Sequence, residues 1–313
     1  MSSLYLGVDV GGTNLRFGVF DAAQCIASYR TAMNLRERCA QAGEAAAAQQ
    51  LVLEALAGGY HRLRQQCPQI DGIGVAFPGF VTADGVLRQS PNIPHLEDFA
   101  LESALTEALQ VPVVLENDAN AAAFGEFWSL RQERPDATSL IYVGLGTGVG
   151  GGWIQGGRPW RGEDGAAMEI GHLTVVPGGR RCGCGNQGCL EQYASAQGLI
   201  SSYLETTGMN ADPKIIAQLA QDENPAALRA FQTLAEHLGQ ALAHVIKVLD
   251  CRQIRVGGGL SAAWDCFGEE LRTQLRSNMI PALQDTVEIA AGNGDDEAGV
   301  RGAALLAREV LSA

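Results

Sequence analysis

Three cysteines and a histidine form the most chemically distinctive pattern in the sequence. Cys182, Cys184 and Cys189 lie within RRCGCGNQGCLE, and His172 precedes the first of them by ten residues. Thiolates and a neutral imidazole are the ligands of tetrahedral Zn²⁺, and the glycines between the cysteines permit tight turns. The spacing C-x-C-x4-C differs from the C-x2-C of zinc fingers, so free thiols remain the alternative. Four protein ligands would complete the tetrahedron, and the prediction is therefore a structural zinc rather than a catalytic one.

An aspartate at a strand-to-helix junction is the candidate for accepting a proton. Asp118 follows VPVVLEN, a predicted strand, and precedes ANAAAFGEFW, a predicted helix. A side chain at such a junction is held rigidly, as a catalytic group must be. The alternative is that Asn117 or Asp118 only caps the helix. Glu169 and Glu191 flank the cysteine segment, and by residue type alone Glu191 would be an exposed acid.

Glycine turns join predicted strands at two places, in LGVDVGGTNLRFGVFD and SLIYVGLGTGVGGGWI. Consecutive N–H groups at such a turn can point at one anion, and Asp9 precedes the first turn, where a carboxylate could hold Mg²⁺. The second turn contains G-x-G-x-x-G, but a strand follows it where dinucleotide binding requires a helix. The sequence has no G-x-x-x-x-G-K-[ST], which excludes a P-loop. A third glycine cluster, 257–259, follows the strand QIRV, so the three together predict a phosphate site.

The elements that would carry these residues alternate between strand and helix. Strands are predicted over 4–10 and 15–19, a helix over 44–66, a strand over 72–77 that ends at Pro78 and Gly79, and a helix at the C-terminus. The two strand–turn–strand segments suggest a duplicated α/β architecture. We expect a first domain over 1–118, joined by the helix 298–313, and a second over 119–297 that carries the cysteine segment.

Composition excludes several classes of protein. The chain has 313 residues and a formal net charge of −13, which is enough for two domains and disfavours nucleic-acid binding. It has neither a secretory signal pattern nor an apolar run of about eighteen residues, so a cytoplasmic location without a membrane span is expected. Cysteines there are free thiols or metal ligands, and the scattered ones are expected to be small buried hydrophobes: Cys25, Cys39, Cys67, Cys251 and Cys266. Four arginines are expected to be solvated charges: Arg158, Arg161, Arg180 and Arg181.

Three motifs resemble a known superfamily. LGVDVGGTNLRFGVFD resembles the first phosphate motif of the sugar kinase, Hsp70 and actin superfamily, VGLGTGVGGG its second, and RVGGGLS its adenosine motif. With the cysteine segment, their order and spacing are similar over nearly the whole chain to the ROK family of repressors, open reading frames and kinases, and most like its glucokinases. The resemblance implies an α/β, two-domain actin-like ATPase fold with the nucleotide in an interdomain cleft.

The resemblance also implies an activity and its residues. The activity is transfer of the γ-phosphoryl group of ATP, with Mg²⁺, to the 6-hydroxyl of a sugar, glucose first, with N-acetylglucosamine, N-acetylmannosamine and fructose as alternatives. Asp118 is the implied catalytic base. The implied sugar-binding residues are Gly79, Asn92, Asn117, Asp118, Glu169, His172 and Glu191. The implied ATP-binding residues are Asp9, Gly11, Gly12, Thr13, Asn14, Gly146, Thr147, Gly148, Gly257, Gly258 and Gly259. The implied zinc ligands are His172, Cys182, Cys184 and Cys189, and Asp9 is the implied Mg²⁺ ligand.

Two other classes of function fit the sequence less well. Sugar-responsive repressors of the family carry a helix-turn-helix before the first phosphate motif. Here that motif begins at Leu4 and the net charge is acidic, so we do not expect a DNA-binding regulator. A nucleotide-switched assembly protein of the actin type gives no reason for the cysteine segment and its two glutamates. The resemblance implies a homodimer whose partners are a small-molecule sugar and ATP, with neither nucleic acid nor membrane. One departure is Cys251, which stands where the family often has proline.

Overall fold

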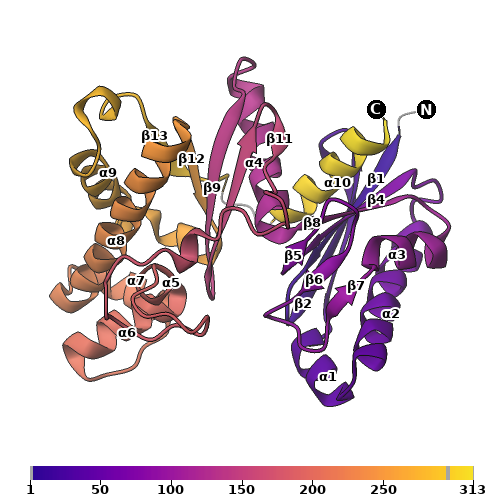
Figure 1. The fold of residues 1–313 in the computed structure, drawn as a ribbon, viewed down its shortest axis with the longest axis horizontal. Helices are drawn as coiled ribbons and strands as arrows, with labels where there is room; N and C mark the ends of the chain where they lie inside the picture. The colour runs from indigo at the N-terminus through magenta and orange to yellow at the C-terminus, as the bar shows by residue number, and fades with distance from the viewer. Residues whose placement is uncertain (1–2, 294–296, 313) are drawn as a thin grey trace. The chain divides into compact units, whose positions relative to one another are not determined.

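The computed structural model describes residues 3–293 and 297–312, and it divides into two compact units (Figure 1). The first comprises Met1–Thr138, Gly152–Ala167 and Glu297–Ala313, and the second comprises Ser139–Gly151 and Met168–Asp296. This division differs from the boundary predicted at residue 118. Helix α4 (Asp118–Glu133) lies in the first unit because it packs along α10 (Ala298–Leu311).

A five-stranded sheet forms the centre of the first unit, in the order β3-β2-β1-β4-β8. Its strands are β1 (Leu4–Val10), β2 (Asn14–Asp21), β3 (Gln24–Ala32), β4 (Gly72–Phe77) and β8 (Val113–Asn117). β2 is antiparallel to both β1 and β3, whereas β1, β4 and β8 are parallel. The carboxyl ends of these three strands therefore share one edge, the usual place for a ligand site in an open α/β sheet.

The C-terminal helix lies directly on one face of this sheet. A Cβ added at Gly7 of β1 would lie 1.9 Å from the carbonyl oxygen of Val300, and one added at Gly74 of β4 would lie 1.9 Å from that of Ala303. Only glycine on the two strands allows the helix backbone to approach so closely. Since α10 also packs on α4, the C-terminal helix belongs to the first unit.

Helices and a small sheet complete the first unit. The hydrophobic core includes Phe17 of β2 and Tyr60 of α2 (Ala45–Arg64), the helix predicted over 44–66. The other elements here are α1 (Leu35–Ala42), α3 (Leu101–Leu109), and the sheet of β5 (Phe80–Val81), β6 (Leu87–Gln89) and β7 (Glu97–Phe99). β10 (Val149–Gln155) begins in the second unit and ends in the first, where it pairs with β11 (Arg158–Pro159).

The second unit contains three parallel strands, with β12 between β9 and β13. The strands are β9 (Ser139–Leu145), β12 (Gln253–Gly257) and β13 (Glu288–Ala291). The longest helix, α8 (Pro225–Leu249), begins at Asn224, whose side chain accepts hydrogen bonds from the next helical N–H groups. α8 packs against α5 (Glu191–Ala194), α6 (Ala196–Thr207), α7 (Pro213–Gln221) and α9 (Gly268–Ser277). The remaining helices are η1 (Ile170–His172), η2 (Gly259–Cys266) and η3 (Pro281–Leu283).

In each unit a glycine turn follows the first strand of a parallel set, β1 with β4 and β8 or β9 with β12 and β13, in agreement with the predicted duplication. The scattered cysteines are free thiols, of which Cys39 and Cys251 are buried and the other three partly buried. Among the described residues, no helix combines the length and the apolar character that a bilayer span requires.

Candidate functional site

Asp118 is the first residue of α4, directly after β8. Asn117 is the capping residue: its Oδ1 accepts the N–H of Asn120 at 3.0 Å, and its Nδ2 donates to the carbonyl oxygen of Gly79 at 3.0 Å. The Asp118 carboxylate accepts the N–H of Ala119 at 2.9 Å. The positive end of the helix dipole favours the ionised carboxylate at this position. The capping alternative therefore applies to Asn117, and Asp118 is held as a hydrogen-bond acceptor at a strand end.

A buried ion pair lies beside this aspartate. The side chain of Glu116 is 2% exposed, and its Oε2 is bound by the guanidinium of Arg161 at 2.8 Å from Nε and 2.6 Å from Nη2. Its Oε1 accepts the Asn117 N–H at 3.0 Å and Nδ2 of Asn120 at 3.2 Å. The prediction that Arg161 is a solvated charge is wrong, because tertiary folding brings it to a carboxylate that needs a partner. Sequence reasoning did not single out Glu116, and it assigned Arg161 to solvent.

The first glycine turn is closed by a hydrogen bond from the Gly11 N–H to the Asn14 carbonyl oxygen at 2.9 Å. The carbonyl oxygen of Thr13 accepts two further N–H groups, from Met33 and Asn34, each at 2.9 Å. Asp9 stands at the end of β1, where Nη1 of Arg16 lies 3.2 Å from its Oδ2. Arg16 thus already supplies positive charge beside Asp9. The role of Asp9 as a Mg²⁺ ligand stays a prediction.

Gly79 and Asn92 lie near these two features in the first unit. Gly79 has φ 143°, and a Cβ there would lie 2.3 Å from the Gln89 carbonyl oxygen, so only glycine fits beside Asn117. Asn92 is exposed in the loop that follows β6, and a Cβ added at Gly12 would lie 4.0 Å from its carbonyl oxygen. The structure therefore brings Gly79 to Asn117 and the Asn92 loop to the first glycine turn.

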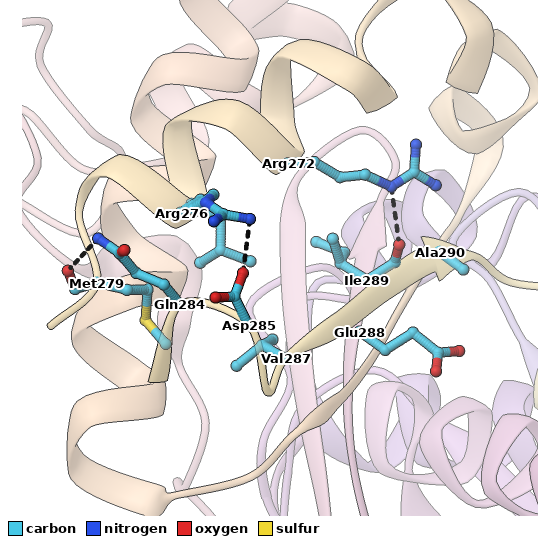
Figure 2. Close-up of a pocket in the computed structure, with 10 residues that line it drawn as sticks. Arg272, Arg276, Met279, Gln284, Asp285, Val287, Glu288, Ile289 and Ala290 are labelled. Atoms are coloured by element: carbon cyan, nitrogen blue, oxygen red, sulfur yellow. Dashed lines mark hydrogen bonds and ion pairs between the residues drawn. The ribbon is translucent and has the colours of Figure 1, made fainter. Parts of the chain in front are cut away.

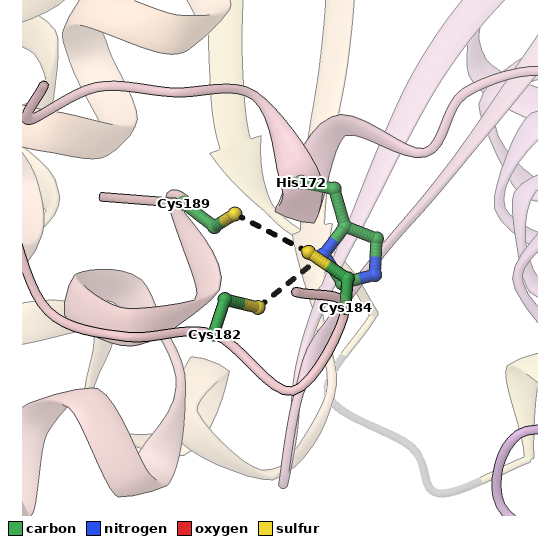
Figure 3. Close-up of side chains that lie close together, drawn as sticks. All are labelled: His172, Cys182, Cys184 and Cys189. Carbon is green, nitrogen blue, oxygen red and sulfur yellow. Dashed lines mark hydrogen bonds between the residues drawn. The ribbon is translucent and has the colours of Figure 1, made fainter. Parts of the chain in front are cut away.

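The four predicted metal ligands lie together in the second unit (Figure 3). Their ligand atoms all lie within 4.8 Å of one another. Sγ of Cys184 is 3.7 Å from Sγ of Cys189, and Sγ of Cys182 is 3.7 Å from Nδ1 of His172. A tetrahedron with Zn–S bonds of about 2.3 Å has S–S edges of about 3.8 Å. The four groups consequently fit a tetrahedral ion in both chemistry and spacing.

Burial and the neighbouring groups shift the pKa values of two thiols in this cluster, Cys189 and Cys184. Burial, with Cys184 and Cys182 beside it, raises the pKa of the Cys189 thiol to about 12. The pKa of Cys184 is lowered, first by the backbone N–H of Asn186 and then by Cys182. A divalent cation would hold the thiols in their deprotonated form.

His172 links the cluster to the two glutamates. Its Nδ1 faces the thiols, and its Nε2 lies 3.8 Å from Oε2 of Glu169. Burial raises the pKa of Glu169 and the Glu191 carboxylate adds to this rise, whereas His172 opposes it. The Oε2 of Glu191 accepts the Val149 N–H at 3.1 Å. The three residues predicted to bind sugar in this segment therefore lie close enough to interact.

Arg180 fastens the cysteine segment to the helices behind it. Its Nη1 donates to the Gln192 carbonyl oxygen at 2.6 Å, and its Nη2 lies 2.7 Å from Oε2 of Glu205. Its guanidinium stands 4.6 Å from the ring centroid of Tyr193. The prediction of a solvated charge is wrong for Arg180, whose side chain is 17% exposed, and right for Arg158 and Arg181, which are exposed.

The second and third glycine clusters also lie side by side. Gly257 pairs with Gly144 across β12 and β9, and Gly258, at φ 80°, approaches Leu145 so closely that a Cβ would lie 2.5 Å from its carbonyl oxygen. The second turn is closed by the Gly146 N–H donating to the Gly148 carbonyl oxygen at 3.0 Å, with Thr147 exposed at its tip. Parallel pairing of β9 and β12 explains how two distant glycine motifs reach one sheet edge.

A cavity of about 510 Å³ lies elsewhere in the second unit, between α9 and β13 (Figure 2). Arg272 and Arg276 line it, and Arg276 pairs with Asp285 at 2.7 Å. None of the predicted site residues, all of which lie in the described ranges, lines this cavity. It is therefore separate from the predicted site.

Comparison with known proteins identifies the family. The chain is 31% identical to a glucokinase of Halalkalibacterium halodurans, covering 97% of this chain and 95% of that one. It is 29% identical to an N-acetyl-D-glucosamine kinase of Vibrio cholerae, covering 97% and 99%. Its fold matches the crystal structure of a ROK family glucokinase from Streptomyces griseus in complex with glucose and AMPPNP, with a TM-score of 0.81 and 30% identity over 98% and 100% of the two chains. This match confirms the predicted actin-like α/β fold class. Since residues 5–310 match the ROK family, the chain belongs to that family.

Proposed function

We propose that glucose is the acceptor of this ATP-dependent sugar kinase and that the γ-phosphoryl group is transferred to its 6-hydroxyl. The observation that carries the proposal is the fixed Asp118 carboxylate at the start of α4, beside Asn117. The likeness to glucokinases at 31% identity, and to a ROK glucokinase that binds glucose and AMPPNP, supports glucose as the sugar.

The reaction asks the protein mainly to position two substrates and to neutralise charge. In our proposal Asp118 accepts the hydrogen bond of the attacking hydroxyl and then its proton, and Asn117 binds a neighbouring hydroxyl. The other hydroxyls would donate hydrogen bonds to Glu169 and Glu191 and accept one from His172. Without these bonds the hydroxyls would lose water without compensation. We propose Asn92 and Gly79 as further sugar contacts of the first unit.

The nucleotide would be held by the glycine turns. The two turns at 11–14 and 146–148 would present backbone N–H groups to the phosphates, and residues 257–259 would border the adenosine. Mg²⁺ would neutralise charge between the phosphates. We propose Asp9 as its protein ligand, with Arg16, 3.2 Å away, sharing in the local charge balance.

We further propose that the metal of the cysteine cluster is zinc. Three thiolates and one imidazole fill its four positions, so it would stabilise the segment and activate no water. With Nδ1 on the metal, the His172 Nε2–H would be a donor of fixed direction, aimed toward Glu169 at 3.8 Å.

The test follows ADP release from ATP and Mg²⁺ with glucose, N-acetylglucosamine, N-acetylmannosamine and fructose. Glucose should give the highest kcat/KM, and Asp118→Asn should lower kcat by at least about 10³-fold, in the range that loss of a catalytic acid or base produces. Asp136→Asn, at an exposed loop position of the same unit, is the matched control and should be fully active.

The outcomes of this panel are distinct. A preference for N-acetylglucosamine would favour the activity that the Vibrio cholerae relative is named for and would overturn glucose. Lack of stimulation by every sugar would overturn the kinase proposal. An active Asp118→Asn protein would show that another group receives the proton.

A further inference from the structure

Glu191 contacts the second glycine turn as well as the predicted sugar wall. Its Oε2 accepts the Val149 N–H at 3.1 Å, and Val149 directly follows the turn 146–148. Resting on the proposed function, we propose that Glu191 is a positioning residue for the nucleotide-phosphate turn. Sugar binding and nucleotide binding are then coupled through this one carboxylate.

The contact is close and directional. A Cβ added at Gly148 would lie 2.3 Å from Oε2 of Glu191, so the carboxylate rests directly against the turn. A backbone N–H bonded to a carboxylate is a charge-assisted hydrogen bond, among the stronger kinds in proteins. A carboxylate has two oxygens, and this bond uses Oε2, so Oε1 can accept from a sugar hydroxyl. One side chain can therefore serve both ligands.

Backbone contacts hold the turn 146–148 in addition to the side chain of Glu191. The Ala196 N–H donates to the Gly146 carbonyl oxygen at 2.9 Å, and Gly171 lies so close to β10 that a Cβ there would be 2.2 Å from the Val149 carbonyl oxygen. These contacts fix the two ends of the turn by backbone groups. Glu191 adds the side-chain contact, and it is the one that a bound sugar can perturb.

The position of Glu191 itself depends on the cysteine segment. It begins α5 two residues after Cys189, and the adjoining Gln192 carbonyl oxygen is bound by Arg180 at 2.6 Å. The Tyr193 hydroxyl accepts the Arg180 N–H at 3.0 Å. The metal cluster and Arg180 thus orient Glu191, and through it the phosphate turn.

The first test measures ADP binding to the full-length protein by calorimetry, without sugar. Glu191→Ala should weaken ADP binding by about tenfold, which corresponds to about 1.4 kcal/mol. Glu191→Gln keeps an oxygen for the Val149 N–H and should stay within about threefold of wild type, since a neutral acceptor forms the weaker bond. Glu169→Ala, which removes a predicted sugar contact but none to the turn, should bind ADP as wild type does.

The second test changes the turn and measures the sugar, since a carboxylate that serves both ligands should transmit a disturbance in either direction. Gly148→Ala would push against the Glu191 carboxylate and should weaken glucose binding, measured without nucleotide, by about threefold or more. The control is Gly58→Ala in α2, outside the predicted site, where an added Cβ would meet no described atom within 4 Å. It should leave glucose binding unchanged.

The results separate this inference from the proposed function. Wild-type affinity for ADP in Glu191→Ala, with its metal content and circular dichroism spectrum intact, would overturn the inference, as would equal glucose binding by the two glycine variants. A wild-type protein that binds ADP but phosphorylates no sugar would overturn the proposed function alone, because the ADP measurement needs no acceptor. A wild-type protein without affinity for ADP would overturn both.

Discussion

The buried pair of Glu116 and Arg161 allows a sharp test of how Asp118 is positioned. Replacing Arg161 with Met keeps an unbranched apolar side chain but removes the guanidinium, and with it both contacts to Oε2 of Glu116, at 2.8 and 2.6 Å. The Glu116 carboxylate then stays in a site where its side chain is 2% exposed, with two neutral donors, the Asn117 N–H and Asn120 Nδ2. A buried charge that loses its partner destabilises the native state strongly.

The expected size of the effect follows from the burial of Glu116, and it lies toward the lower end of the range for buried pairs because the Arg161 side chain is 30% exposed. Removing one member of a buried ion pair typically costs about 3–5 kcal/mol, whereas exposed pairs contribute about 1 kcal/mol or less. Arg88 and Asp98 form such an exposed pair in the same unit, at 2.7 Å with side chains 58% and 72% exposed. Arg88→Met is therefore the matched control, expected to cost less than about 1 kcal/mol.

The assay is urea denaturation followed by circular dichroism, together with kcat for sugar phosphorylation. Arg161→Met should lose several times more stability than Arg88→Met and should also lower kcat, because Glu116 holds the N–H of Asn117 and the side chain of Asn120 beside Asp118. Adding Glu116→Gln removes the unpaired charge and should recover most of the stability. Equal losses in the two arginine variants would refute the reasoning, since they would show that Glu116 does not need Arg161.

Three further predictions concern other parts of the chain. Met168 has φ 66°, a left-handed conformation that costs a side-chain-bearing residue about 1–2 kcal/mol. Met168→Gly should therefore stabilise the protein by about 0.5 kcal/mol, after the greater freedom of glycine in the unfolded chain is counted. A loss of stability above about 1 kcal/mol in urea denaturation would contradict this. Burial lowers the pKa of His237 below its ordinary 6.5, more than Glu236 raises it, so its neutral form is favoured in the fold. This contribution to stability is present above about pH 6.5 and lost as pH falls through the lowered pKa; His237→Phe should flatten the decline between pH 7.5 and 5, and an unchanged slope would count against it. Cys184→Ser should reduce the bound zinc from about one ion per chain and lower the unfolding temperature. Cys67→Ser, outside the cluster, is the control and should change neither quantity. Full zinc content in the Cys184→Ser protein would contradict a site with four ligands.

Local pattern was sufficient to predict the strands, turns and helices that carry the site. The alternation at Leu4–Val10, the glycine turn after it and the junction at Asn117 and Asp118 each follow from rules that act over a few residues. The parallel pairing of β1, β4 and β8 then follows from the usual topology of α/β units and gathers their ends at one edge. The gathering of His172, Cys182, Cys184 and Cys189 was also predictable, because their spacing is short and their side chains are of the types that bind zinc.

The domain division and two arginines were not predictable in this way. The boundary at residue 118 assumed that α4 starts a new domain, but α4 packs along a helix at the far end of the chain. Arg161 meets Glu116 across 45 residues, and Arg180 meets Glu205 across 25. Residue type makes an arginine look solvated, and only tertiary structure supplies the carboxylates that hold these two partly buried side chains.

The cysteine segment shows why such tertiary contacts matter for function. It is fastened once by the cluster of His172 and three cysteines and again by Arg180, whose bonds to Gln192 and Glu205 use no metal ligand. Loss of the proposed zinc alone would therefore leave the Arg180 contacts in place, while loss of Arg180 would leave the cluster. Because Glu191 stands between these two attachments, either loss should loosen its bond to Val149 without abolishing the fold of the second unit. On our proposal, the segment would then affect the turn 146–148 in graded steps, because each loss weakens the bond of Glu191 to Val149 only partly.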